Sequence, residues 1–218
     1  MKSRFIYIIL AIMLVILVTP FIRQRGITGH LVTTLITAMI PLTSFYALTA
    51  DRNRAIVILL MAAPFVILDG MSLFFANRYL MIASIGFGTI LYLYITVLLV
   101  INLLSHRVVT ADLIYCAIST YFLIGVMWAG IYIILEGISP GSYSGISETA
   151  DLLYFSFVTL TTVGFGDITP QSILGKRFAV FEAAMGGIYL AVIIAMIVGR
   201  YMSMQAGQDS ESELNSKK

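Results

Sequence analysis

The sequence predicts an all-α membrane protein with six transmembrane helices and a re-entrant helix between the fifth and the sixth. The first observation is composition: 60% of the 218 residues are hydrophobic, 11% are charged, and the mean hydropathy is +0.99. Soluble chains contain about 25% charged residues. The second is that the apolar residues gather in long runs, in which a lipid-facing backbone must form its own hydrogen bonds as a helix. The third is a segment before the last run that is too short to span.

Six apolar runs approach or exceed the ~18–20 residues that cross the hydrocarbon core. They are Phe5–Ile22, Leu31–Ala50, Ala55–Ala76, Tyr79–Leu104, Leu113–Leu135 and Gly175–Met204. The first run follows Lys2 and Arg4, as in a signal peptide. It is longer than the usual apolar core of such a peptide, and no small-residue cleavage site follows, so we expect it to be kept as a span.

The runs divide into two expected units and a tail. The first four form a transmembrane unit at 1–107, with the layout of a sensor. The last two form a second unit at 108–204, which is expected to hold the functional site. Residues 205–218 are polar and rich in Ser, Gln and acidic side chains, and this composition predicts a disordered tail. No segment of this sequence is typical of a nucleotide-binding domain.

A turn-rich segment and a short helix precede the last run. Residues 137–145 predict an exposed loop, because Gly, Ser and Pro dominate them. Ser147 is the expected N-cap of a helix at Glu148–Thr161, and Asp151 lies in its first turn. The helix is expected to enter the membrane and return, with its carbonyl end toward the bilayer centre. Partial negative charge at such an end favours a cation.

A glycine-containing motif follows this helix. It reads Thr161-Thr162-Val163-Gly164-Phe165-Gly166-Asp167, continued by Ile168-Thr169-Pro170 and Gly175-Lys176-Arg177. Successive carbonyls point one way only if the backbone alternates between ordinary and positive φ, which Gly164 and Gly166 adopt without a Cβ penalty. Taken alone, the motif is also compatible with an ordinary turn after a β-branched run.

The motif resembles the selectivity filter of tetrameric potassium channels, whose loop reads TVGYG. The resemblance covers about 114–201, and it points to six-transmembrane prokaryotic members without a charged voltage sensor or a cytosolic regulatory domain. It implies potassium sites at Thr162, Val163, Gly164 and Phe165, with Gly166 completing the filter. Because the motif occurs once and such pores use four loops, we expect a homotetramer.

What the resemblance implies for the whole protein is passive potassium transport. The chain is then not an enzyme, it needs no cofactor beyond the permeant potassium ion, and it lies in the plasma membrane with both termini cytoplasmic. Its partners are its own copies, membrane lipid and an unknown regulatory ligand or subunit. A nonselective cation channel of the same fold is the alternative, although its filter usually breaks the second half of the motif. A membrane enzyme requires a catalytic cluster, and the only histidines, His30 and His106, lie near run ends.

Three residues are candidates for supporting the filter. Asp167 lies at its outer end, and the acidic partner that some relatives give it is replaced by Val158. Tyr154 stands where relatives often have tryptophan, and its hydroxyl is expected to reach Asp167. Glu182, in the last run, either supports the short helix from behind or lies at the membrane interface; support is favoured. Phe165 replaces the usual tyrosine and lacks its hydroxyl.

Two further sites leave alternatives open. Gly186 and Gly187 lie where relatives bend to open, so they are candidates for a gating hinge or for close helix packing. Asp69 is a candidate for gating or ion sensing, or for a buried anchor paired with Arg78 or with hydroxyls. The fourth run has no Lys or Arg after Arg78, so it lacks the arginine repeat of a voltage sensor and no intrinsic voltage gating is expected.

Overall fold

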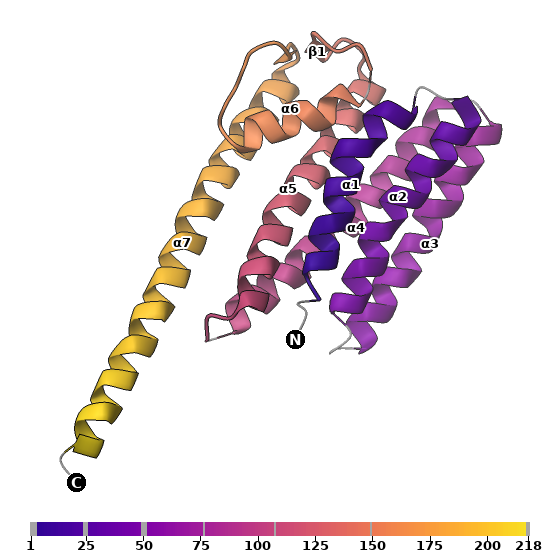
Figure 1. Ribbon diagram of the computed structural model, residues 1–218. Helices are drawn as coiled ribbons and strands as arrows, with labels where there is room; N and C mark the ends of the chain where they lie inside the picture. Colours follow the sequence, from indigo (N-terminus) through magenta and orange to yellow (C-terminus); the bar gives the residue numbers. More distant parts are fainter. Residues whose placement is uncertain are drawn as a thin grey trace.

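A computed structural model describes residues 4–23, 26–48, 52–75, 77–106, 108–148 and 150–216, and Figure 1 shows its arrangement. Its helices are α1 (Ile6–Arg23), α2 (Gly26–Ala47), α3 (Arg52–Phe74), α4 (Arg78–Ser105), α5 (Ala111–Ile138), α6 (Asp151–Leu160) and α7 (Ile173–Ser216). Two short strands, β1 (Tyr143–Ser144) and β2 (Thr169–Pro170), pair antiparallel, with Tyr143 opposite Pro170. Lys2, Arg107 and Thr149 lie outside the described residues, as does the end of the predicted tail at 217–218.

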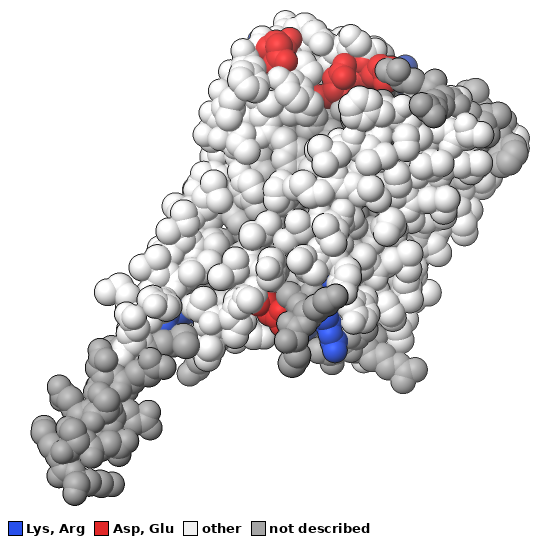
Figure 2. Space-filling model, in the orientation of Figure 1, with Lys and Arg blue, Asp and Glu red and all other residues white. Residues whose placement is uncertain are grey.

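The all-α membrane class is confirmed. Helices α2, α3, α4, α5 and α7 contain described stretches that are long and apolar enough to cross a membrane, and α1 contributes a shorter apolar stretch at Ile6–Thr19. On the face shown in Figure 2, charged side chains gather at the two ends of the molecule and leave an uncharged band between them. The count of six spans stays a prediction.

The first four helices form a sequential bundle that α5 joins. Helix α1 packs on α2, α2 on α3, and α3 on α4, while α5 contacts both α4 and α1. Gly130 allows the close approach of α5 to α4, because a Cβ there would lie 2.2 Å from Thr89 Oγ1. Helices α2 and α3 continue through Pro41 and Pro64, as membrane helices with packed neighbours can.

Helix α7 makes few contacts within the chain. It packs on α6 and, less extensively, on α5. Figure 1 shows it diverging from α5 toward its C-terminal end. Only 17% of its spanning part is buried within the chain, against 61% for α5. Much of its apolar surface is therefore left for lipid or for other chains.

The predicted disordered tail is wrong for 205–216, where α7 continues to Ser216. This stretch has no proline and one glycine, Gly207. Extending an existing helix by one residue is far less costly than nucleating a new one. A polar composition therefore did not stop the helix here. The division of the rest into units at 1–107 and 108–204 stays a prediction.

Candidate functional site

The short helix α6 begins at Asp151 and not at Glu148, as the sequence predicted. Ala150 occupies the N-cap position and makes no side-chain capping bond. Instead, Asp151 Oδ2 accepts hydrogen bonds from the backbone N–H groups of Ser147 (2.7 Å) and Glu148 (2.9 Å). The predicted cap at Ser147 is therefore wrong, because the carboxylate in the first turn binds the preceding backbone in its place.

The loop before α6 is partly buried, in contrast to the exposed loop that its composition predicted. Ser142 and Tyr143 are 2% and 3% exposed. The Tyr143 ring packs on those of Tyr132 and Phe155, with centroid distances of 5.5 and 5.3 Å. Glu136 fixes the loop from the end of α5, since its carboxylate accepts from the backbone N–H of Tyr143 at 3.1 Å. Aromatic packing thus outweighs the turn-forming composition here.

The motif after α6 has the alternating backbone that the sequence predicted. Gly164 and Gly166 have φ values of +57° and +80°, while Val163 and Phe165 between them are not in the left-handed region. Thr162 also has a positive φ, +59°, and among the described residues it is the only non-glycine that does. A β-branched residue in this conformation is strained by about 1–3 kcal/mol, so its surroundings must hold it there.

Hydrogen bonds to α6 hold the inner end of this segment. The Val158 carbonyl accepts from the N–H groups of Val163 (3.0 Å) and Gly164 (3.2 Å), and Thr162 N–H donates to the Thr159 carbonyl at 2.9 Å. These bonds satisfy carbonyls at the end of the helix, which have no partner within it. They also bind the positive-φ positions directly to a regular element.

The side chains of the motif have little cover from their own chain. Thr161 through Asp167 are all exposed, and Val163 and Phe165 are 54% and 70% exposed. Outward packing of these two side chains therefore needs atoms from outside the chain.

The outer end of the motif is held by a tyrosine and by the loop. Tyr154 Oη donates to Asp167 Oδ2 at 2.8 Å, which is the contact that the sequence predicted. This hydrogen bond holds the pKa of Asp167 below its usual range. On the other side, Gly145 has φ +81°, and a Cβ there would lie 2.1 Å from the Asp167 carbonyl oxygen. Only glycine fits at position 145.

Glu182 lies behind α6, where the sequence favoured a supporting role. The side chain is fully buried, and one carboxyl oxygen bonds the Tyr132 hydroxyl of α5. The other lies 2.5 Å from Ser156 Oγ of α6, which also lies 2.8 Å from the Gly125 carbonyl. The network joins α5, α6 and α7 through one side chain. The effect of this network on the filter stays a prediction.

The two glycines of α7 differ in their surroundings. A Cβ on Gly186 would lie 2.1 Å from the Leu160 carbonyl oxygen at the end of α6, whereas a Cβ on Gly187 would meet nothing within 4 Å in the chain. Helix α7 is continuous through both. For Gly186 the structure supports close packing, and a hinge at either position stays a prediction.

Asp69 of α3 has hydroxyl partners and no arginine partner among the described residues. Its Oδ2 accepts from Thr34 and lies 3.4 Å from His30 Nε2, and its Oδ1 lies 3.4 Å from Ser84 Oγ. Arg78 instead donates from Nε to the Gly137 carbonyl at 2.5 Å. Of the two anchors that the sequence left open, the arginine is wrong and the hydroxyls are confirmed.

Sequence reasoning missed Thr162 and Gly145 as positions that shape the motif. Thr162 was assigned a potassium site but no positive φ, although its φ continues the alternation set by the glycines. Gly145 was assigned only to a loop. What distinguishes it is its contact with Asp167, which lies 22 residues later in the sequence. No local pattern reveals such a contact. It also missed His30 as a neighbour of Asp69.

Known protein families match this chain in the part that holds α5, α6, the glycine-containing motif and α7. The model of a family described as ion channel matches residues 120–203, from α5 through the motif and most of α7. Protein LctB of Geobacillus stearothermophilus is 36% identical over 103 residues, which are 43% of this chain and 75% of that protein. No solved structure gives a significant match.

Other relatives match over shorter parts of their length. Two-pore potassium channel 2 of Arabidopsis thaliana is 28% identical over 93 residues, 41% of this chain and 21% of that protein. The hyperpolarization-activated voltage-gated potassium channel of Methanocaldococcus jannaschii is 38% identical over 52 residues, 24% of this chain and 23% of that protein. The chain therefore spans about a fifth of these two relatives.

Replacing Tyr154 by phenylalanine is expected to raise the pKa of Asp167, because the hydrogen bond that stabilises the carboxylate is lost. In the unmodified chain this bond is present at neutral pH and is lost as the pH falls through the lowered pKa. The acid-induced change in ion flux through reconstituted protein should thus move to higher pH in the variant. In an Asp167→Asn background Tyr154→Phe should have no further effect. An unshifted pH profile would show that the bond does not control Asp167.

Glu182→Ala is expected to lower thermal stability in detergent, because Tyr132 and Ser156 lose a buried partner at roughly 1–3 kcal/mol each. Glu182→Gln keeps an acceptor for Tyr132 and a donor for Ser156, so it should lose much less. Because glutamine matches glutamate in size but has no charge, the Glu182→Gln variant shows the effect of the lost charge alone. Equal losses in the two variants would contradict this assignment.

Gly186→Ala should displace the end of α6 and lower both thermal stability and ion flux, because the new Cβ overlaps the Leu160 carbonyl. Gly187→Ala is the matched control one residue away, with open space around the new Cβ in the chain. It should keep the stability of the unmodified protein. If both variants lost ion flux but kept the thermal stability of the unmodified protein, the result would favour the hinge over the packing contact.

Proposed function

Because this chain belongs to the potassium channel family, we propose that four copies of it form one potassium-selective pore through which the ion moves passively. The observation that carries the proposal is the single filter motif, with positive φ at Thr162, Gly164 and Gly166. Pores of this kind replace the water around the ion with backbone carbonyls from four loops. One chain supplies one loop, so fourfold symmetry completes the site.

The surface of the chain supports this assembly. Val163 and Phe165 are exposed beside the motif, and the spanning part of α7 is only 17% buried. Copies arranged around an axis would cover both surfaces at once. The permeant potassium ions would bind at Thr162, Val163, Gly164 and Phe165, with no cofactor and no catalytic step.

The helix α6 supports the choice of a cation. Its N-terminal end carries Asp151, and its carbonyl end leads directly into Thr161 and Thr162. Four such ends directed at an axis would place partial negative charge around it. We also propose a plasma-membrane location with both termini in the cytoplasm, which puts the re-entrant region 136–175 on the outer side.

Voltage is not part of the proposed gating. Helix α4 carries Arg78 at its start and no Lys or Arg from 79 to 105. A sensor needs several charges that move through the membrane field. The relative from Methanocaldococcus jannaschii is named as voltage-gated, but its match covers only 24% of this chain.

Flux from liposomes that contain only the purified chain tests the proposal. Potassium efflux should exceed sodium efflux, and the detergent-solubilised protein should have the mass of four copies. Gly164→Ala is the control without conduction, because alanine at φ +57° carries a steric penalty of about 1–2 kcal/mol at the filter. Gly86→Ala on α4, where a Cβ would meet nothing within 4 Å in the chain, is the matched glycine substitution outside the filter that should keep conducting.

Two results would contradict the proposal. Equal potassium and sodium flux would favour the nonselective cation channel, and a conducting monomer would exclude the shared pore. Recording the same protein in planar bilayers from −100 to +100 mV, roughly the range that moves gating charge, tests the gating statement. The open fraction should stay nearly constant, and a steep change across this range would disprove it.

A further inference from the structure

A cavity of about 500 Å³ lies between the first four helices and the start of the pore region. Every helix from α1 to α6 contributes to its wall, including Leu153 of α6. Cavities of 300–1,000 Å³ are the usual size for small-molecule sites. The proposed pore does not use this cavity.

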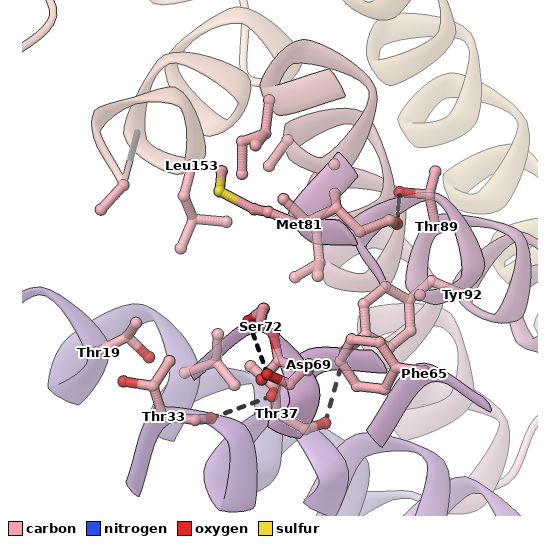
Figure 3. Close-up of a pocket in the computed structure, with 18 of the residues that line it drawn as sticks. Thr19, Thr33, Thr37, Phe65, Asp69, Ser72, Met81, Thr89, Tyr92 and Leu153 are labelled. Atoms are coloured by element: carbon pink, nitrogen blue, oxygen red, sulfur yellow. Dashed lines mark hydrogen bonds between the residues drawn. The ribbon is translucent and has the colours of Figure 1, made fainter. Parts of the chain in front are cut away.

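One side of the cavity is polar and centred on a carboxylate. Figure 3 shows Asp69 with Thr33, Thr37 and Ser72 on this side. The Asp69 side chain is 21% exposed. A carboxylate offers about four acceptor positions, and among the described residues Asp69 uses one for Thr34 and has a distant second partner in Ser84 at 3.4 Å. His30 Nε2 also lies 3.4 Å from Oδ2. Acceptor capacity therefore remains on a carboxylate that lines the cavity.

Two more polar atoms in the wall have no hydrogen-bond partner. Four buried side-chain polar atoms lack one among the described residues, and two of the four, Thr19 Oγ1 and His30 Nε2, belong to residues that line this cavity. Thr19 itself is 93% buried, being 7% exposed. His30 Nε2 lies 3.4 Å from Asp69 Oδ2 without forming a hydrogen bond. Buried polar groups are normally satisfied, so two unsatisfied ones in residues around the same cavity favour a polar occupant.

The other side of the cavity is apolar and aromatic. In Figure 3, Met81 and Leu153 lie across the cavity from Asp69, and the rings of Phe65 and Tyr92 lie at one end. These rings pack edge to face, with centroids 6.3 Å apart. Aromatic faces attract organic cations, and the methionine and leucine suit a hydrocarbon body.

We propose that this cavity binds a small amphiphilic ammonium compound, whose N–H groups donate to Asp69 and whose apolar body packs on Phe65, Tyr92 and Met81. Arg78 also lines the cavity and keeps its positive charge, but its Nε donates to the Gly137 carbonyl, and among the described residues it forms no ion pair with Asp69. An ammonium at Asp69 can donate to its carboxylate, whereas a carboxylate or a phosphate placed there would be repelled by it. Its body would also contact Leu153, on the helix that leads into the filter motif.

Binding of 4-phenylbutylamine, compared with its neutral analogue 4-phenylbutan-1-ol, tests the site. Calorimetry on the full chain in dodecyl maltoside, a detergent without charge or amine, is the measurement. The amine should bind about tenfold or more tightly than the alcohol, which is the usual advantage of a hydrogen bond to a charged group. Equal affinities in the unmodified protein would overturn the proposal.

Three variants locate the binding. Asp69→Asn keeps the shape of the side chain and should reduce amine affinity to that of the alcohol. Asp112→Asn removes a carboxylate at the start of α5, away from the cavity, and should change neither affinity. Ile133→Trp fills the cavity with Asp69 intact and should weaken both probes. An amine affinity that Asp69→Asn leaves unchanged would overturn the proposal, as would full binding of both probes to Ile133→Trp.

The ammonium can come from a soluble amine or from an aminophospholipid head group. Adding phosphatidylethanolamine or phosphatidylglycerol to the detergent solution separates these sources. Competition with the amine by phosphatidylethanolamine alone supports the site and assigns a lipid to it. If neither lipid competes and the protein still prefers the amine to the alcohol, the result supports the site and assigns a soluble ligand to it. These binding measurements do not depend on whether the chain conducts potassium.

Discussion

The carbonyl end of α6 lies directly against the backbone of α7 at Gly186, and the geometry of the glycine-containing motif depends on this contact. The strained segment that begins at Thr162 is hydrogen-bonded to the last turn of α6, so any displacement of that turn displaces the segment. Glycine at 186 brings the two backbones within a distance that excludes a Cβ. Glu182, one turn earlier on α7, fixes the same helix through Ser156.

The outer side of the pore region uses a different means of support. There the loop 139–145 contributes a buried aromatic ring, Tyr143, and a glycine, Gly145, that lies against the Asp167 carbonyl. The pairing of β1 with β2 ties this loop to the chain after the filter. The segment is thus held at its inner end by a helix and at its outer end by a folded loop. Such support from both ends is what a non-glycine residue with positive φ requires.

The long apolar helices and the alternating backbone of the motif could be predicted because their signals are local. Length and hydropathy indicate the helices, and the spacing of Gly164 and Gly166 indicates the alternating backbone. The start of α6 could not be predicted in this way, since Ser147 and Asp151 are both good partners for a helix N-terminus and only the fold selects Asp151. Burial of Tyr143 depends on rings of α5 and α6, and composition predicts the opposite. The Asp69 partners lie on α2 and α4, so Arg78 was only one candidate among several.

The exposure of Val163 and Phe165 has a consequence for tetramers that contain both wild-type and mutant chains. If neighbouring copies pack the outward side chains of the filter, its geometry depends on all four chains. The ion selectivity of the tetramer is then limited by the most distorted chain. In the proposed tetramer, one copy with a distorted loop would spoil the packing around its three partners. Lesions in this segment would therefore be dominant in a cell that makes both forms, whereas lesions that only prevent a chain from folding would remove that chain and be recessive.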